Sequence, residues 1–225
     1  MLGEQGDQPW LREAGAQAVR ELAQLTVLFP LTRVLASPRV IGAELLLSAP
    51  QPAVLAANHA SDIDTPLILQ ALPRPFRRRT VVAAAADRFY RDRARAALTT
   101  LLFNTFPFDR GASLRGLQSA ALLLREGYNV LLYPQATRSG GSLEGFRTGV
   151  ARLAIATSSA LIPVYVGGSA LVMPKGRGVI QRARVTVAFG RWLTAVEDEQ
   201  PQQLLERLQQ AVATLRDAAA RPRSR

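Results

Sequence analysis

The amino-acid sequence predicts an α/β protein, in which helices flank a mixed β-sheet. Short apolar runs typical of strands alternate with longer amphipathic stretches typical of helices along the whole chain. Its 225 residues, of which 48% are hydrophobic, suit one domain that buries a proper core. No internal repeat and no low-complexity linker divides the chain. We therefore expect a single domain over residues 40–225, preceded by a helical segment over residues 1–39.

The N-terminal segment has apolar residues at roughly helical spacing between positions 9 and 36, with a kink or break expected at Pro30. One interpretation is a pair of helices packed on the core. The other is an amphipathic anchor that lies in a membrane interface. The charges that would then lie near the headgroups are Arg12, Arg20, Arg33 and Arg39. The run from Leu22 to Leu35 is too short and too polar to span a bilayer, and Met1 to Gln8 lacks the basic start of a secretory signal.

The other elements follow from apolar periodicity and from the turn residues between them. We expect strands over residues 40–47, 53–57, 80–85, 129–133, 161–166 and 184–189. We expect helices over residues 66–72, 87–103, 113–126, 146–157 and 201–219, and loops over 74–79 and 106–111. Pro163 lies inside one strand, which indicates an edge strand or one that is paired only in part.

The composition restricts the chemistry and the partners. A net charge of +11 favours anionic partners such as phospholipid surfaces, nucleotide-bearing substrates or nucleic acid, although an arginine bias can also reflect coding bias. Nucleic acid is not expected, because aromatic residues make up 6% of the chain and no recognisable nucleic-acid motif is present. The absence of cysteine removes disulfides and thiolate chemistry, and a single histidine rules out a multi-histidine zinc site. We expect no metal and no cofactor.

That single histidine, His59, follows the apolar run 53–57, which is expected to be a buried strand. Pro66 suits the first position of a helix, with Asp64 or Thr65 as its cap. His59 is therefore expected at the carboxyl end of a strand and Asp64 at the start of the next helix, where the positive end of the helix dipole favours a carboxylate.

This placement is suited to general-base chemistry. A neutral imidazole can take a proton from a hydroxyl, and a carboxylate on its other ring nitrogen fixes the tautomer and stabilises the imidazolium. Asp64 is five residues from His59, so the turn must fold it back; Asp62 is the local competitor. Taken alone, the motif could equally be a junction with a capping aspartate and an incidental histidine.

Further segments place polar or apolar groups at strand ends, where α/β proteins usually carry their sites. In chain order, the segments are Asn58-His59 to Asp64, Phe106 to Arg110, Tyr133 to Ser139, and Leu161 to Val164. Together they resemble the lysophosphatidic acid and glycerol-3-phosphate acyltransferase superfamily. Its blocks are Asn-His-x4-Asp, an arginine-bearing block, Phe-Pro-Glu-Gly-Thr-Arg-Ser, and an apolar Ile-Pro-Val block. The resemblance covers roughly residues 40–190 and makes the domain over 40–225 an acyltransferase domain.

The resemblance implies direct acyl transfer from acyl-CoA or acyl-carrier protein to a hydroxyl of a lysophospholipid such as 1-acylglycerol-3-phosphate. His59 would be the general base and Asp64 its partner. The substrate-binding residues would be Asn58, Arg110, Gln135, Ala136, Thr137 and Arg138. Among these, Arg110 and Arg138 would hold an acceptor phosphate, and backbone amides of residues 135–138 would hold the oxyanion. The protein would be cytoplasmic and peripherally associated with the inner face of the membrane.

The sequence departs from the family pattern at Gln135-Ala136, where the family has Glu-Gly. Gln keeps the length and an acceptor oxygen but loses the charge. We expect this change to weaken or alter acceptor binding. It also keeps open an acyltransferase for a non-phospholipid hydroxyl, or a catalytically attenuated protein that binds acyl lipids.

Overall fold

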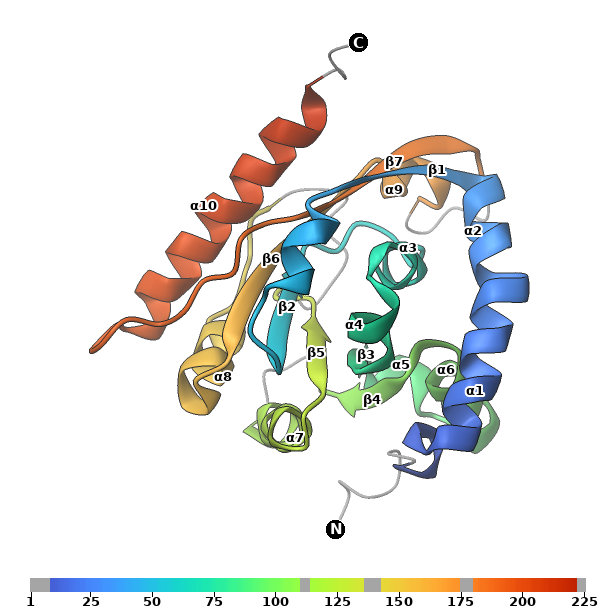
Figure 1. Cartoon of the computed structure of the whole chain (residues 1–225), viewed down its shortest axis with the longest axis horizontal. Coiled ribbons are helices and arrows are strands. Elements are labelled where there is room, and N and C mark those ends of the chain that lie inside the picture. The colour runs from blue at the N-terminus through green and yellow to red at the C-terminus, as the bar shows by residue number, and fades with distance from the viewer. Residues whose placement is uncertain (1–8, 110–113, 136–142, 175–179, 222–225) are drawn as a thin grey trace.

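The computed structural model describes residues 9–109, 114–135, 143–174 and 180–221 and is built around one seven-stranded sheet (Figure 1). Its strands are β1 (Ala36–Ile41), β2 (Ala53–Ala57), β3 (Thr80–Ala85), β4 (Thr105–Phe108), β5 (Asn129–Leu132), β6 (Ala160–Gly167) and β7 (Ala183–Phe189). The order across the sheet is β1-β7-β6-β2-β5-β3-β4. β6 and β7 pair antiparallel and the other neighbours pair parallel, which confirms the predicted mixed sheet.

Helices cover both faces of the sheet. They are α1 (Ala14–Ala23), α2 (Phe29–Leu35), α3 (Asp64–Ala71), α4 (Arg74–Arg78), α5 (Ala86–Phe89), α6 (Arg93–Phe103), α7 (Leu114–Arg125), α8 (Gly149–Thr157), α9 (Ser169–Val172) and α10 (Pro201–Ala220). Short 3₁₀ turns occupy η1 (Pro9–Arg12) and η3 (Ala43–Leu47), and a π-helical turn, η2 (Gln24–Leu28), joins α1 to α2.

Alternation along the buried strands divides the core between the two faces. Leu55 and Ala57 of β2 face the cluster that includes α3 and α4, whereas Val54 and Ala56 face the cluster that includes α7, α8 and α10. A continuously apolar strand of this kind is typical of a sheet that is covered on both sides. This position in the middle of the sheet holds the carboxyl end of β2, and therefore His59, firmly in place.

The prediction of a strand over residues 40–47 is wrong, because the strand lies earlier, over residues 36–41. The strand is β1 and ends at Ile41, because Gly42 follows with a φ of 74° and a Cβ there would collide with the carbonyl of Phe189. The leucine run after it forms the 3₁₀ turn η3, in which Leu46 is buried and Leu47 is exposed.

Parts of two expected loops are regular structure instead, and the end of the second, from Arg110, lies outside the described residues. Residues 74–78 form α4, because Pro75 suits a first helical turn and Phe76 anchors the helix in the core. Residues 105–108 form β4, which pairs with β3 and buries Phe106. The helix expected over 87–103 is divided into α5 and α6, and Asp92 caps α6 by accepting a bond from the Arg95 amide at 2.7 Å.

Pro163 does not place β6 at an edge. β6 lies between β2 and β7, and Pro163 pairs with Ala56 of β2. Proline has no N–H, and at Pro163 this gap faces β7, where the ladder between β6 and β7 has already ended at Phe189. On that side Gly190 donates to the Pro163 carbonyl at 2.9 Å. The edge assignment is therefore wrong, and interrupted pairing on one side is what the structure shows.

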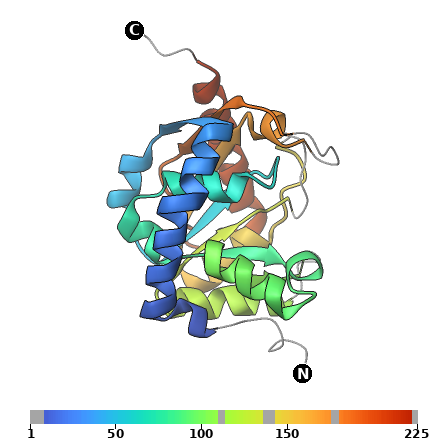
Figure 2. The same cartoon turned by 90° about the vertical axis from the view of Figure 1, so that its right-hand side faces the viewer.

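α1 packs along α6, as Figure 2 shows, and Gln17 donates to the Arg78 carbonyl of α4, whereas α2 packs against α3. Arg20 is 5% exposed and donates to the carbonyls of Leu101 at 2.9 Å and Thr100 at 3.3 Å, while Gln24 donates to that of Leu102 at 2.8 Å. Those carbonyls lie in the last turn of α6, where most carbonyls lack partners within the helix. The carbonyl of Thr100 also accepts from the Asn104 amide. Burial lowers the pKa of Arg20 to about 10, so it stays charged at neutral pH. The expectation that Arg20 lies near headgroups is wrong.

Together α1, η2 and α2 form an N-terminal arm over residues 14–35. The face of this arm that is turned away from the core is apolar and exposed. Its exposed members, each more than half exposed, are Val19, Leu22, Leu25, Val27, Leu31 and Val34. One face of these helices packs on the core, as the first interpretation predicts, and the exposed apolar face leaves the membrane anchor as a prediction. Within the part of the chain that the structure describes, no helix is long and apolar enough to cross a membrane.

Replacing Arg20 with methionine should lower the free energy of unfolding by about 1–3 kcal/mol, because the carbonyls at the end of α6 lose their buried donors while the apolar stem is kept. Urea denaturation measures the change. Arg125→Met, on the exposed end of α7, is the matched control and should stay within about 0.5 kcal/mol of wild type. Equal shifts in the two variants would contradict the capping role.

Candidate active site

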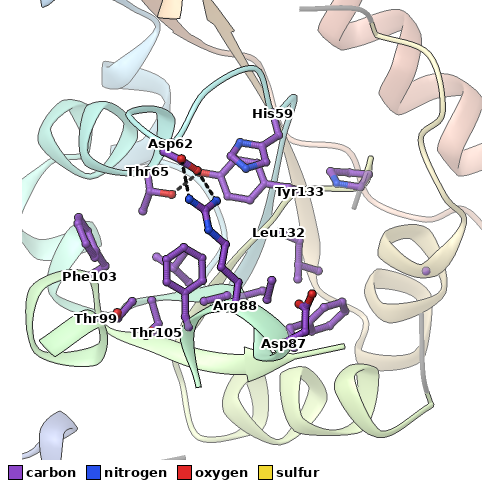
Figure 3. A pocket seen from close by; sticks show the side chains of 18 of the residues that line it. His59, Asp62, Thr65, Asp87, Arg88, Thr99, Phe103, Thr105, Leu132 and Tyr133 are labelled. Carbon is purple, nitrogen blue, oxygen red and sulfur yellow. Dashed lines mark hydrogen bonds and ion pairs between the residues drawn. The ribbon is translucent and has the colours of Figure 1, made fainter. Parts of the chain in front are cut away.

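A cavity of about 660 Å³ opens beside the carboxyl ends of β2, β5 and β3 (Figure 3). These strands are parallel, so the loops that follow them meet at one edge of the sheet. The apolar lining includes Val82, Leu132, Phe103, Phe108 and Leu117, and the polar lining includes His59, Asp62, Arg88, Tyr133 and Arg147. The cavity therefore offers a large apolar volume beside the single histidine.

His59 and Asp64 form the pair that the sequence predicts. The Nδ1 atom of His59 lies 2.9 Å from Oδ2 of Asp64. Asp64 is 0% exposed, and the same oxygen accepts hydrogen bonds from the amides of Ala60 at 2.7 Å and Ser61 at 2.8 Å. A carboxylate on Nδ1 places the ring proton there, which leaves the lone pair on Nε2 for proton transfer.

The position of Asp64 differs from the predicted cap. α3 begins at Asp64 itself, two residues before Pro66, and the carboxylate bonds backward to the turn that carries His59. It does not cap the amides of the following helical turn. The carboxylate thus holds the shape of the turn and the orientation of the imidazole at the same time.

Tyr133 fixes the face of the imidazole. The two rings stack with centroids 4.2 Å apart and an interplanar angle of 27°. The Tyr133 hydroxyl shares a 2.7 Å hydrogen bond with Thr65, and burial, together with the charge of Asp64, raises the pKa of the phenol. The neutral phenol therefore keeps the ring in place without competing for a proton near neutral pH. The sequence motif contains Tyr133, but sequence reasoning gave it no role.

Asp62, the competitor for the role of Asp64, has a different partner. Its two oxygens accept hydrogen bonds from Arg88 at 2.7 Å and 2.8 Å, and this pairing raises the pKa of Arg88 (Figure 3). Sequence reasoning missed Arg88, for which the only signal was the crowding of charges between residues 87 and 95. The two neighbouring aspartates therefore have separate partners.

Asn58 is buried and forms hydrogen bonds with the backbone of β6. Its carboxamide is 0% exposed, donates to the Val166 carbonyl at 2.9 Å and accepts from the Val166 amide at 2.7 Å. This exchange ties the end of β2 to the end of β6. The geometry favours a positioning role for Asn58 over the predicted contact with substrate.

Gln135 lies beneath the histidine turn and is 6% exposed. Its oxygen accepts from the His59 amide at 2.9 Å, and its nitrogen donates to the Glu144 carbonyl at 2.9 Å. One partner needs an acceptor and the other a donor, which an amide supplies and an ionised carboxylate does not. The other predicted substrate-binding residues lie outside the described residues: Arg110, Ala136, Thr137 and Arg138.

The fold and this site define a class of protein, namely an α/β protein with a buried His–Asp pair at the carboxyl edge of its sheet beside an apolar cavity. The chain belongs to the acyltransferase family, whose sequence model matches residues 38–167. This confirms the resemblance seen in the sequence.

Two known proteins are similar to this chain, one in sequence and one in fold. The chain is 28% identical over 177 residues to a 1-acyl-sn-glycerol-3-phosphate acyltransferase of Chlamydomonas reinhardtii, a match that covers 78% of this chain and 52% of the relative. The chain therefore spans about half the length of that relative. Its fold matches the crystal structure of the 1-acyl-sn-glycerophosphate acyltransferase PlsC from Thermotoga maritima with a TM-score of 0.71 and 18% identity, covering 97% of this chain and 85% of the other.

Proposed function

We propose that this protein moves a fatty acyl group from a thioester donor, acyl-CoA or acyl-carrier protein, to a hydroxyl of a lysophospholipid such as 1-acylglycerol-3-phosphate. The observation that carries the proposal is the 2.9 Å contact between Nδ1 of His59 and the buried Asp64 at the wall of an apolar cavity. The name of the algal relative supports the choice of acceptor.

In the proposed reaction, Nε2 of His59 takes the proton of the acceptor hydroxyl as its oxygen attacks the thioester carbonyl. The tetrahedral intermediate expels the thiolate as the C–S bond breaks, and the imidazolium returns the proton to the sulfur. Asp64 stabilises the imidazolium between these steps. Base catalysis of this type contributes about 10²–10⁴ in rate. No covalent acyl-enzyme is required.

The substrate contacts are proposals of the same kind. The apolar lining of the cavity suits an acyl chain, and Arg147 brings positive charge to the same cavity. Arg110 and Arg138 would hold the acceptor phosphate, and backbone amides of residues 135–138 would hold the oxyanion. Gln135 makes two hydrogen bonds as an amide and so supports the His59 turn, which is compatible with the proposed enzyme.

The proposed location is the cytoplasmic side of a membrane, with the exposed apolar face of the N-terminal arm in the interface. That face carries residues such as Leu22, Leu25 and Leu31, each more than half exposed. The net charge of +11 would add attraction to anionic lipids.

The test is product formation by the purified protein on lipid vesicles. Acyl-CoA and, separately, acyl-carrier protein are offered with lysophosphatidate, glycerol-3-phosphate or a long-chain alcohol, and esters are identified by mass spectrometry. The expected product is 1,2-diacylglycerol-3-phosphate, formed from lysophosphatidate. Ester formation with the alcohol alone would show a non-phospholipid acceptor, and lipid binding with no ester from any pair would reject the enzyme.

Replacing Gln135 with glutamate should give a pH-dependent loss of activity. The new carboxyl faces the Glu144 carbonyl, so the native arrangement needs its protonated form, which raises its pKa in the folded protein. The arrangement is present at low pH and is lost as the pH rises through that raised value. The ratio of variant to wild-type kcat/KM should therefore be near one in mild acid and fall by about 10- to 100-fold in mild base.

The control for this variant is Gln210→Glu, the same chemical change on the exposed face of α10. It should track wild type at every pH. A ratio for Gln135→Glu that does not change with pH, or an increase in activity at neutral pH, would contradict the bridging role of the amide.

A further inference from the structure

A second, smaller crevice of about 410 Å³ lies away from the His59 cavity and is lined by arginines. Its lining comprises Arg33, Val34, Arg182, Ala183 and Arg184. Arg33 lies in the last turn of α2, and Arg182 and Arg184 flank the start of β7. Among the described residues, no acidic side chain lines this crevice and none of these arginines forms an ion pair.

This cluster is electrostatically unbalanced. Guanidinium groups that line one small crevice without an acid repel each other, and an anion between them removes that repulsion. Arginine presents a planar fork of donors that matches phosphate, often with two parallel hydrogen bonds. The crevice is therefore complementary to a phosphate group.

The surroundings indicate which phosphate would bind. Val34 lines the crevice and is 54% exposed, and Leu31, one turn earlier on the same helix, is 54% exposed. A free phosphate or a nucleic-acid backbone would gain nothing from this apolar rim. A phospholipid in a bilayer supplies a phosphate and apolar chains at adjoining depths, which matches the charges and the rim together.

The sheet relates the crevice to the active site. β7 runs antiparallel to β6, with Thr186 opposite Gly167, so Arg184 lies beyond the carboxyl end of β6. β2 runs parallel to β6, and His59 follows its carboxyl end. The crevice and His59 therefore lie along the same edge of the sheet, two strands apart.

We propose that this crevice binds the phosphate of an anionic phospholipid in the membrane surface. The proposal rests on the proposed attachment to membranes and gives it a specific site. An occupied crevice would hold the bilayer against the edge of the sheet at which the His59 cavity opens, and so favour entry of a lipid acceptor from the membrane.

The test compares two doubly substituted full-length proteins with the same loss of charge. Arg182→Gln with Arg184→Gln removes the crevice, and Arg115→Gln with Arg125→Gln removes two exposed arginines from α7. Binding is measured by sedimentation with phosphatidylcholine vesicles, with and without phosphatidylglycerol. The crevice variant should lose about 10- to 30-fold in affinity for the anionic vesicles and little for the neutral ones, while the α7 variant loses less than about threefold.

Equal losses in the two variants would show diffuse attraction to net charge and overturn the proposal. Inorganic phosphate and a DNA oligonucleotide test the other sources of phosphate: thermal stabilisation by either one that is lost in the crevice variant, with vesicle binding intact, would also overturn it. Melting temperatures check the fold, and Arg33→Gln offers a single change if the double variant unfolds.

Activity separates this proposal from the proposed reaction. With an acceptor dissolved in detergent, the crevice variant should match wild type, since no bilayer has to be oriented; with the acceptor in anionic vesicles it should be slower. If wild-type protein transfers no acyl group, the vesicle measurement still decides whether the crevice binds lipid phosphate.

Discussion

Alanine at position 59 should reduce kcat for acyl transfer by about 10²–10⁴, the usual worth of a general base. In the proposed reaction the imidazole takes the hydroxyl proton, and Asp64 and Tyr133 hold the ring in one orientation. The fold should persist, because Asp64 keeps its bonds from the amides of Ala60 and Ser61. Steady-state kinetics with saturating donor and acceptor measure the change, and KM for the donor should alter much less than kcat.

A second variant at the same position removes the effect of the cavity that alanine leaves. His59→Gln keeps a polar side chain of similar length but cannot accept a proton near neutral pH. It should be as impaired as His59→Ala. A glutamine variant with kcat near that of wild type would show that the ring has only a structural role.

Asparagine at position 64 should also reduce kcat, by about 10²–10⁴. Oδ2 of Asp64 accepts three hydrogen bonds, from His59 and from two backbone amides, and an uncharged amide loses the stabilisation of the imidazolium. If the asparagine turns its NH₂ group toward Nδ1, the imidazole also takes the wrong tautomer. The measurement is kcat, with circular dichroism to check that the variant is folded.

Asp62→Asn is the matched control, since it makes the same chemical change two residues earlier in the same loop. Asp62 binds Arg88, whereas Nδ1 of His59 contacts Asp64, so the loss of the Asp62 carboxylate should change kcat by less than about tenfold. Equal losses in the two asparagine variants would show that the negative charge of the loop matters and not the orientation of the imidazole.

The sequence predicts the elements whose local signal is strong. The apolar run 53–57 and the amphipathic stretch 201–219 have clear boundaries, and both elements appear in the structure within a residue of the expected bounds. The basic stretch 74–79 was misread, because its charges indicate a loop while the burial of Phe76 makes it a helix. The prediction of an edge strand from Pro163 was wrong for a similar reason. No local pattern shows that pairing between β6 and β7 ends beside this residue.

The site shows the same division. Asp64 is close in sequence to His59, and a plausible turn brings them together, so the pair is predictable. The partners that support it come from distant segments: Gln135 is 76 residues from His59, Val166 is 108 from Asn58, and Arg88 is 26 from Asp62. Only the sheet order brings these segments to one edge, and no local pattern determines that order.

The most direct test of the account is a single-turnover experiment with wild-type protein in excess over acyl-CoA, in which thiol release is followed with and without lysophosphatidate. Direct transfer from the donor to a hydroxyl activated by His59 gives no burst without acceptor and one thiol per ester formed with it. A rapid burst of thiol release without acceptor, with the acyl group left on the protein, would contradict His59 as the base for the acceptor hydroxyl.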